Sequence, residues 1–216
     1  MPDGVRVNGE RLWASLMAMA EIGATPGGGS NRLALTHLDR DARDRLAEWC
    51  EAAGAEVSID GIGNMFARRE GRDHRLPPVL VGSHLDTQPM GGRFDGVLGV
   101  LAALEILRTL QDAGVTTARP IELVNWTNEE GARFAPAMIG SGVFSGLQDA
   151  DAAKGLRDAD GKRLGDELEA IGYAGRRPVG GRAIEAYFEL HIEQGPVLEA
   201  EGLPIGGATR WRELRR

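Results

Sequence analysis

Two short apolar segments that flank a helix constrain the fold of this chain more than any other feature. Val79–Gly82 and Ile121–Trp126 consist mainly of apolar residues, which is typical of strands buried inside a sheet. Between them, a glycine-rich loop at residues 91–96 leads into Val97–Leu110, whose apolar pattern predicts a helix. A strand, a helix and another strand in this order predict an α/β fold with helices on both faces of a twisted sheet.

The rest of the chain adds helices and strands to this unit. Helices are expected over residues 9–22, 39–53 and 164–171, a hairpin over residues 56–60 and 64–69, and a last strong strand over residues 183–192. Because a hairpin is antiparallel, whereas strands joined through a helix run parallel, we predict a mixed sheet. With 216 residues, the chain is long enough to bury a core in one large domain or two small ones.

Composition and charge exclude several classes of protein. With 42% hydrophobic and 26% charged residues, the chain is typical of a globular protein and not of a disordered, collagenous or coiled-coil one. The net charge of −7 argues against nucleic acid as a partner, because a chain that neutralises phosphates needs a basic surface. Lys154 and Lys162 are the only lysines and the arginines are scattered, so no basic patch is expected.

No segment is expected to enter a membrane. The best apolar run, Val97–Leu104, stops at Glu105 and is much shorter than the roughly 20 residues that cross a bilayer. Residues 12–20 imitate part of a signal peptide, but acidic residues precede them, and Asn8 suits the start of an ordinary helix. The lone Cys50 forms no internal disulfide, which favours a reducing, cytoplasmic location and metal ligands other than sulfur.

Side chains that suit metal binding follow three of the expected inner strands. In open α/β sheets, ligands bind beyond the carboxyl ends of the strands. His84 and Asp86 end the first of these strands and, being two residues apart, share a face. His84 could bind a metal there while Asp86 accepts a hydrogen bond from its other ring nitrogen. A buried histidine satisfied by a neighbouring aspartate is an equal alternative.

Asp95 lies in the glycine-rich loop just before the expected helix. An aspartate at this position commonly caps the helix, and taken alone this is the better explanation. A carboxylate can also bridge two cations, and the flexible glycines would let the backbone aim it at His84.

Two adjacent acids, Glu129 and Glu130, follow the second apolar strand. Adjacent side chains on a strand point to opposite faces, so both enter one site only if the chain turns, for which Gly131 is suited. One acid could then bind a metal and the other act as a general base, although a solvated acidic turn is the simpler explanation for such a pair. His191 ends the last strand, and Gln194 follows it.

Taken together, these motifs resemble the N-carbamoyl-L-amino-acid hydrolase branch of the M20 metallopeptidase family, which also contains β-ureidopropionases and allantoate amidohydrolases. The residues that carry the resemblance are GSHLDTQPMGGRFDG at 82–96, NEEG at 128–131 and LHIEQGP at 190–196. The resemblance extends from the first helix to about residue 207. It implies a zinc-exopeptidase-like catalytic domain with a site for two divalent cations.

The resemblance implies a role for each candidate residue. Asp95 would bridge the two metal ions, His84 and His191 would complete the protein ligands of one ion, and Glu130 would bind the second. Zinc, manganese, cobalt and nickel all suit such ligands, and the sequence does not choose between them.

Three further residues would act on the reaction itself. Glu129 would be the general base, Asp86 would orient His84, and Gln194 would contact a small-molecule substrate near the metals. The implied reaction is hydrolysis at a ureido or amidine-type carbon, which releases ammonia, and carbon dioxide from carbamoyl substrates. An M20 aminopeptidase or deacylase is the alternative, although those enzymes often have an acid at the position of His191.

The length of the chain departs from this family. Members are about twice as long, with a lid and dimerisation domain and then a second catalytic half, which contains the last histidine ligand of the second metal. Residues 1–207 resemble the N-terminal part of the catalytic domain, and residues 208–216 form an atypical tail. We therefore expect a truncated chain with an incomplete second metal site, without the lid through which the family forms homodimers, and with little or no activity by itself. An inactive metal-binding fragment is the corresponding alternative.

Overall fold

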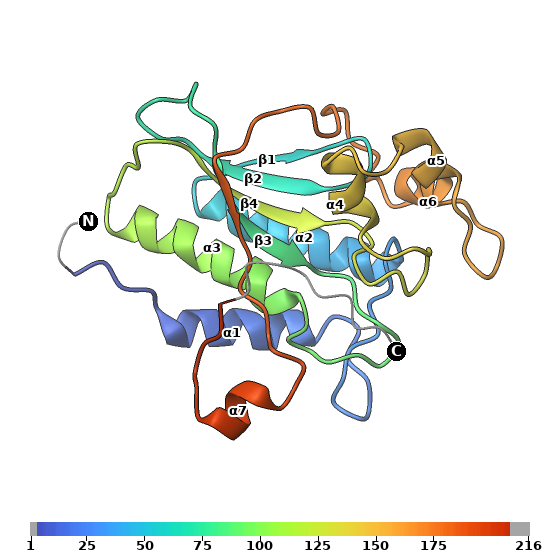
Figure 1. Cartoon of the computed structure of the whole chain (residues 1–216), viewed down its shortest axis with the longest axis horizontal. Helices are drawn as coiled ribbons and strands as arrows, with labels where there is room; N and C mark the ends of the chain where they lie inside the picture. Colours follow the sequence, from blue (N-terminus) through green and yellow to red (C-terminus); the bar gives the residue numbers. More distant parts are fainter. Residues whose placement is uncertain (1–3, 208–216) are drawn as a thin grey trace.

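The fold is built on a five-stranded mixed sheet (Figure 1). The computed structural model describes residues 4–207, and the tail at residues 208–216 lies outside them. In sheet order, the strands are β1 (Glu56–Ile59), β2 (Met65–Arg69), β4 (Ile121–Trp126), β3 (Val79–His84) and β5 (Ala186–Phe188). The pairs β1–β2 and β2–β4 are antiparallel, whereas β4–β3 and β3–β5 are parallel, which confirms the mixed sheet.

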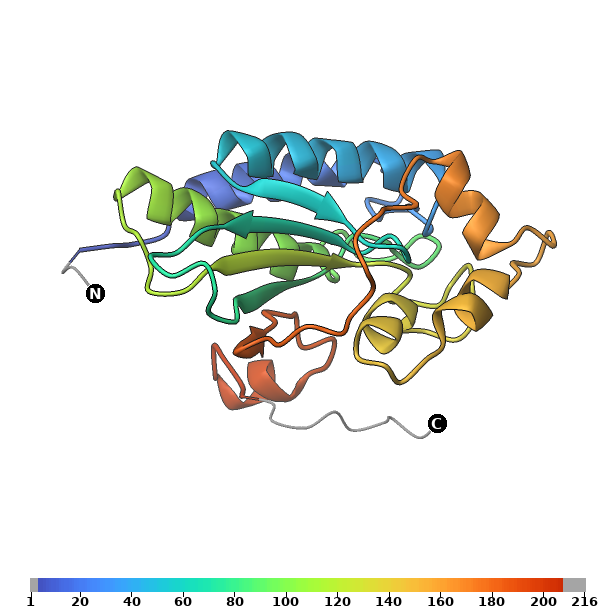
Figure 2. The ribbon, with the colours of Figure 1, turned by 90° about the horizontal axis from the view of Figure 1, so that it is seen from above.

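Three long helices cover one face of the sheet (Figure 2). They are α1 (Gly9–Ala20), α2 (His37–Ala52) and α3 (Val97–Asp112). Asn8 and Thr36 cap the first two of these helices with their side chains. Alternate strand residues, including Met65, Ala67 and Leu123, pack against these helices in the main core. In residues 4–207, no helix has the length and apolar character needed to cross a membrane.

The opposite face of the sheet carries a smaller apolar cluster. Phe66, Leu80, Val124 and Trp126 form this cluster, and Phe144 at the end of α4 (Ile139–Phe144) packs against it. Helices therefore lie on both faces of the sheet, as the sequence predicts. The covering is unequal, because α4 is much shorter than the three helices on the other face.

The later part of the chain differs from the sequence expectation in detail. Besides the expected α6 (Leu164–Ala170), it forms α4, α5 (Ala150–Gly155) and α7 (Val197–Glu201), each too short to show a helical apolar period. Only Ala186–Phe188 of the strand expected over residues 183–192 pairs with β3. Beyond Phe188 the chain leaves the sheet, and Glu189 and His191 contact Ser83 and Asp95 through their side chains.

The parallel strands determine where the sequence motifs meet. Because β3, β4 and β5 are parallel, their carboxyl ends lie at one edge of the sheet. His84 is the last residue of β3, Glu129 and Glu130 follow the end of β4, and His191 follows β5. The N-terminus of α3 reaches the same edge, two residues after Asp95. The fold thus gathers three separate motifs in the region where α/β proteins bind ligands.

Candidate metal centre

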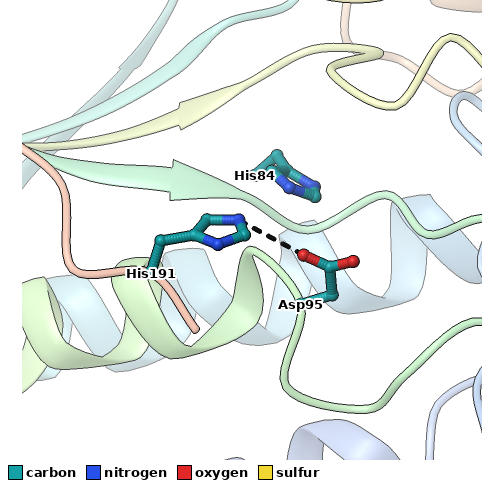
Figure 3. A group of neighbouring side chains, drawn as sticks. All are labelled: His84, Asp95 and His191. Carbon is teal, nitrogen blue, oxygen red and sulfur yellow. Dashed lines mark ion pairs between the residues drawn. The ribbon is translucent and has the colours of Figure 1, made fainter. Parts of the chain in front are cut away.

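Two histidines and one aspartate form a compact cluster at this edge of the sheet. The side chains of His84, Asp95 and His191 each offer one ligand atom, and these atoms all lie within 4.8 Å of one another (Figure 3). His191 Nε2 is 3.2 Å from Asp95 Oδ1, and the two imidazole rings are 6.2 Å apart between centroids. The resemblance implies that these three residues are the ligands of the first ion.

Backbone carbonyls orient both imidazoles toward the cluster. His84 Nδ1 donates a hydrogen bond to the carbonyl oxygen of Asp86 at 2.8 Å, and His191 Nδ1 donates one to the carbonyl oxygen of Ile192 at 2.8 Å. These bonds leave Nε2 of each ring facing the cluster, as a metal ligand requires.

The side chain of Asp86 has a different contact from the one expected. Its Oδ1 is 4.0 Å from His84 Nδ1, beyond hydrogen-bond distance, so only the backbone of Asp86 orients the imidazole. The carboxylate instead accepts hydrogen bonds from the backbone N–H groups of Glu129 and Glu130, at 3.2 and 3.3 Å. Asp86 therefore connects the end of β3 to the acidic loop that follows β4.

Asp95 does not cap α3 with its side chain. The N-cap position belongs to Gly96, and no side chain caps the helix there. The Asp95 carboxylate instead faces His191 and accepts a hydrogen bond from Gln194 Nε2. The structure therefore favours the ligand interpretation of Asp95 over the capping interpretation.

Gly96 makes room for His84 in this arrangement. A Cβ atom at Gly96 would lie 2.4 Å from Cε1 and Nε2 of the His84 ring. Gly96 also has a φ of +66°, a conformation that side-chain-bearing residues rarely adopt. A side chain at position 96 is thus excluded both by the backbone and by the imidazole.

A backbone turn brings both acids of the loop to one cavity. Asn128 and Gly131 on either side of them have positive φ values of 51° and 66°, which is the turn that the sequence required. The cavity has a volume of about 250 Å³ and is lined by every candidate residue except Asp86. A larger groove of about 720 Å³ shares Glu129 with it.

The two acids occupy different parts of this cavity. Glu129 Oε2 lies 3.3 Å from His84 Nε2, directly beside the cluster. Glu130 Oε2 accepts a hydrogen bond from Gln88 Nε2 at 2.9 Å, and Glu130 is not among the residues whose ligand atoms gather within 4.8 Å. Sequence reasoning missed Gln88, which lies inside the 82–96 motif but carries an amide that neither titrates nor attracts notice as a metal ligand.

The charges of the site shift the pKa values of its members. The hydrogen bond with His191 lowers the pKa of Asp95, and the same bond raises the pKa of His191 to about 9. Burial raises the pKa of Glu129, against the opposing effect of His84. Two imidazole nitrogens and a carboxylate oxygen are the donors that zinc and similar divalent ions accept, so the residues present fit a metal ion.

The comparisons with known proteins agree with this geometry. A histidine–aspartate–histidine cluster with an adjacent glutamate, at the carboxyl ends of parallel strands, has the donor set that metal-dependent hydrolases use. The chain belongs to peptidase family M20/M25/M40, whose family model matches residues 80–207. The family predicted from the three sequence motifs is thereby confirmed.

Individual relatives and solved structures are similar to almost the whole chain. It is 54% identical over 209 residues to the N-carbamoyl-L-amino-acid amidohydrolase of Rhizobium meliloti, covering 97% of this chain and 50% of the relative. It is 31% identical to a ureidoglycolate hydrolase of Arabidopsis thaliana, covering 97% and 46%. A hydantoinase/carbamoylase family amidase from Burkholderia ambifaria matches with a TM-score of 0.90 and 62% identity, covering 92% and 49%. The chain thus spans about half the length of the curated relatives it matches.

Proposed function

We propose that the chain provides metal ligands and the general base of an amidohydrolase with two metal ions. Its reaction would be hydrolysis of C–N bonds in N-carbamoyl-L-amino acids or related ureides. The observation that carries this proposal is the cluster of His84, Asp95 and His191 with Glu129 at 3.3 Å from His84. The names of the Rhizobium and Arabidopsis relatives support the substrate class.

The described residues suit the two ions unequally. His84, Asp95 and His191 would hold the first ion, which could be zinc, manganese, cobalt or nickel. The second would share Asp95 and take Glu130, whose carboxylate lines the same cavity. When bound, such a pair of ions polarises the carbonyl under attack and lowers the pKa of water.

Glu129 would move the proton. A general base works best when its pKa is close to the working pH, and burial raises the pKa of Glu129 in that direction. Its carboxylate would take a proton from the attacking water and deliver it to the leaving nitrogen. Gln194, whose amide lines the cavity, would contact the substrate next to Asp95.

Ammonia release tests the proposal. Because the chain spans about half of its relatives, we would assay it alone and as a chimera in which it replaces the corresponding half of the Rhizobium relative. With N-carbamoyl-L-amino acids and ureidoglycolate as substrates, we expect metal-dependent release by the chimera and little or none by the chain alone.

The Glu129→Gln variant of the chimera is the matched control, since the amide keeps the size of the side chain but accepts no proton. We expect it to retain metal and to lose activity by about 10²-fold or more. A folded, metal-loaded chimera that cleaves dipeptides or N-acyl amino acids but no ureido substrate would instead identify an aminopeptidase or deacylase. A chimera without any hydrolysis would leave the chain as a metal-binding fragment.

A further inference from the structure

A group of buried polar side chains adjoins the acidic loop that carries Glu129 and Glu130, and none of its members lines the cavity. These residues are Arg43, Asp60, Asn64 and Thr127. The central residue of the group is Asn64, which directly precedes β2 and is fully buried. Asn64 Oδ1 accepts the backbone N–H of Thr127 at 3.0 Å, and Nδ2 donates to the carbonyl oxygen of Gly140 at 3.0 Å. One side chain therefore bridges the end of β4 and the first turn of α4.

Asp60 determines which way the Asn64 amide faces. An Asp60 carboxylate oxygen accepts a hydrogen bond from Asn64 Nδ2 at 2.9 Å, and its other oxygen accepts the backbone N–H groups of Ile62 and Asn64. Because a carboxylate only accepts, Nδ2 must face Asp60, and Oδ1 is left for Thr127. The orientation of the amide is thus fixed by chemistry and not by packing alone.

The backbone of Gly140 packs closely against the Asn64 amide. The backbone of Gly140 donates to the carbonyl oxygen of Thr127 at 2.9 Å, which brings the two chain segments together. A Cβ atom at Gly140 would lie 2.2 Å from Asn64 Oδ1 and 2.5 Å from the nitrogen of Thr127. Only a glycine allows the Asn64 amide and the two segments to meet in this way.

Arg43 of α2 contacts the chain on both sides of the hydrogen bond between Asn64 and Thr127. It is fully buried, donates to the carbonyl oxygen of Gly63 at 2.7 Å and to Thr127 Oγ1 at 3.3 Å, and pairs with the buried Asp39. Since Gly63 precedes Asn64, Arg43 fixes both partners of the Asn64–Thr127 hydrogen bond.

Thr127 and Gly140 are the two ends of the segment that carries Glu129 and Glu130. Within it, Met138 N–H donates to the carbonyl oxygen of Glu129 at 2.7 Å. We propose that Asn64 is a positioning residue that holds the two ends of this segment together and thereby positions Glu129 and Glu130 at the metal centre. This inference rests on the proposed function, because it assigns Glu130 to the second ion.

Cobalt binding by an Asn64→Leu variant tests the inference. Leucine has a similar size but neither donates nor accepts, so Thr127 and Gly140 lose their bridge. Leu46→Ala is the control, because Leu46 is equally buried but lies in the main core. Both variants should lower the melting temperature of the metal-free chain.

The two variants should differ in cobalt affinity and in local hydrogen exchange. In Asn64→Leu we expect the second cobalt ion to bind about 10-fold to 100-fold more weakly, with a changed visible spectrum, while the first ion changes little. Hydrogen exchange should accelerate in residues 127–140 of the metal-free chain. Leu46→Ala should show neither effect. Unchanged cobalt affinity and exchange in Asn64→Leu, or equal changes in the control, would overturn the inference.

The same experiment separates this inference from the proposed function. A wild-type chain that takes up no cobalt would contradict the proposed function, whereas one that takes up a single ion would match a second site that this chain provides only in part. The inference would then be decided by hydrogen exchange alone: faster exchange confined to residues 127–140 of Asn64→Leu would support the positioning role, and unchanged exchange would overturn it.

Discussion

Replacing Gly96 by alanine should weaken binding of the first metal ion while leaving the fold in place. The new Cβ would lie 2.4 Å from two atoms of the His84 ring, whereas nonbonded carbon atoms settle at about 3.5 Å or more. The ring must therefore move by about 1 Å to relieve the overlap. A functional constellation tolerates displacements of only about 0.5 Å, so His84 would no longer reach an ion held by Asp95 and His191.

Gly96→Ala should have two effects, a loss of folding stability and a loss of metal affinity, and a control variant can separate them. Alanine at a φ of +66° costs about 1 kcal/mol of stability, whatever surrounds it. Losing one of three protein ligands should weaken metal binding by about 100-fold, equivalent to about 2.8 kcal/mol. Gly114 has a φ of +60° and no atom within 4 Å of the point that a Cβ would occupy, so Gly114→Ala carries only the backbone cost.

Calorimetric titration of both variants and the wild type with zinc measures the difference, and urea unfolding of the metal-free chains measures the backbone cost. We expect Gly96→Ala to lose at least as much stability as Gly114→Ala, because only the former displaces the buried His84 ring, and we expect weakened zinc binding only in Gly96→Ala. Equal zinc affinity in Gly96→Ala and Gly114→Ala would refute the reasoning, because it would show that His84 is not a ligand or that its position is unconstrained.

Three further predictions concern single side chains. The hydrogen bond with Asp95 raises the pKa of His191 from 6.5 to about 9. The protonated imidazole therefore stabilises the metal-free chain fully below pH 6.5, and this stabilisation is lost as the pH rises through 9. Urea unfolding of wild type and His191→Gln against pH should show this difference, and parallel curves would contradict it. Asn125 is fully buried and neither atom of its amide has a hydrogen-bond partner among residues 4–207, so Asn125→Leu should raise the free energy of unfolding by about 1 kcal/mol; a loss of stability would show that the amide is needed. Burial raises the pKa of the Cys50 thiol to about 12, so a thiol reagent at pH 8 should label Cys50 only in urea, and rapid labelling of the native chain would disprove its burial.

The central part of the fold could be predicted from sequence because its signals are local. The apolar run of Ile121–Trp126 matches β4 at both ends, and the helix expected over residues 97–110 is α3 with two more residues. The last strand was harder, because pairing with β3 ends at Phe188 although apolar residues continue to Ile192. The length of a strand depends on its partner, and no local pattern contains that information.

The composition of the candidate site was predictable, but its hydrogen bonds were not. Histidines at strand ends nominate His84 and His191, whereas Asp95 taken alone is better explained as a helix cap and becomes a ligand candidate only through the combined motifs. The fold does bring the three side chains together. The roles of the Asp86 backbone and carboxylate depend on where residues 129 and 130 lie in space. Asn64 gives no sequence signal at all, because an asparagine between a turn and a strand usually serves the turn itself.

The location of a bound ion tests the central claim most directly. Crystals of the zinc-loaded chain, measured at the zinc absorption edge, would give an anomalous peak at the position of each ion. We predict a peak at about 2.0–2.2 Å from His84 Nε2, His191 Nε2 and a carboxylate oxygen of Asp95. Zinc peaks only at other places, with these three side chains unliganded, would contradict the claim that the edge of this sheet is a metal centre.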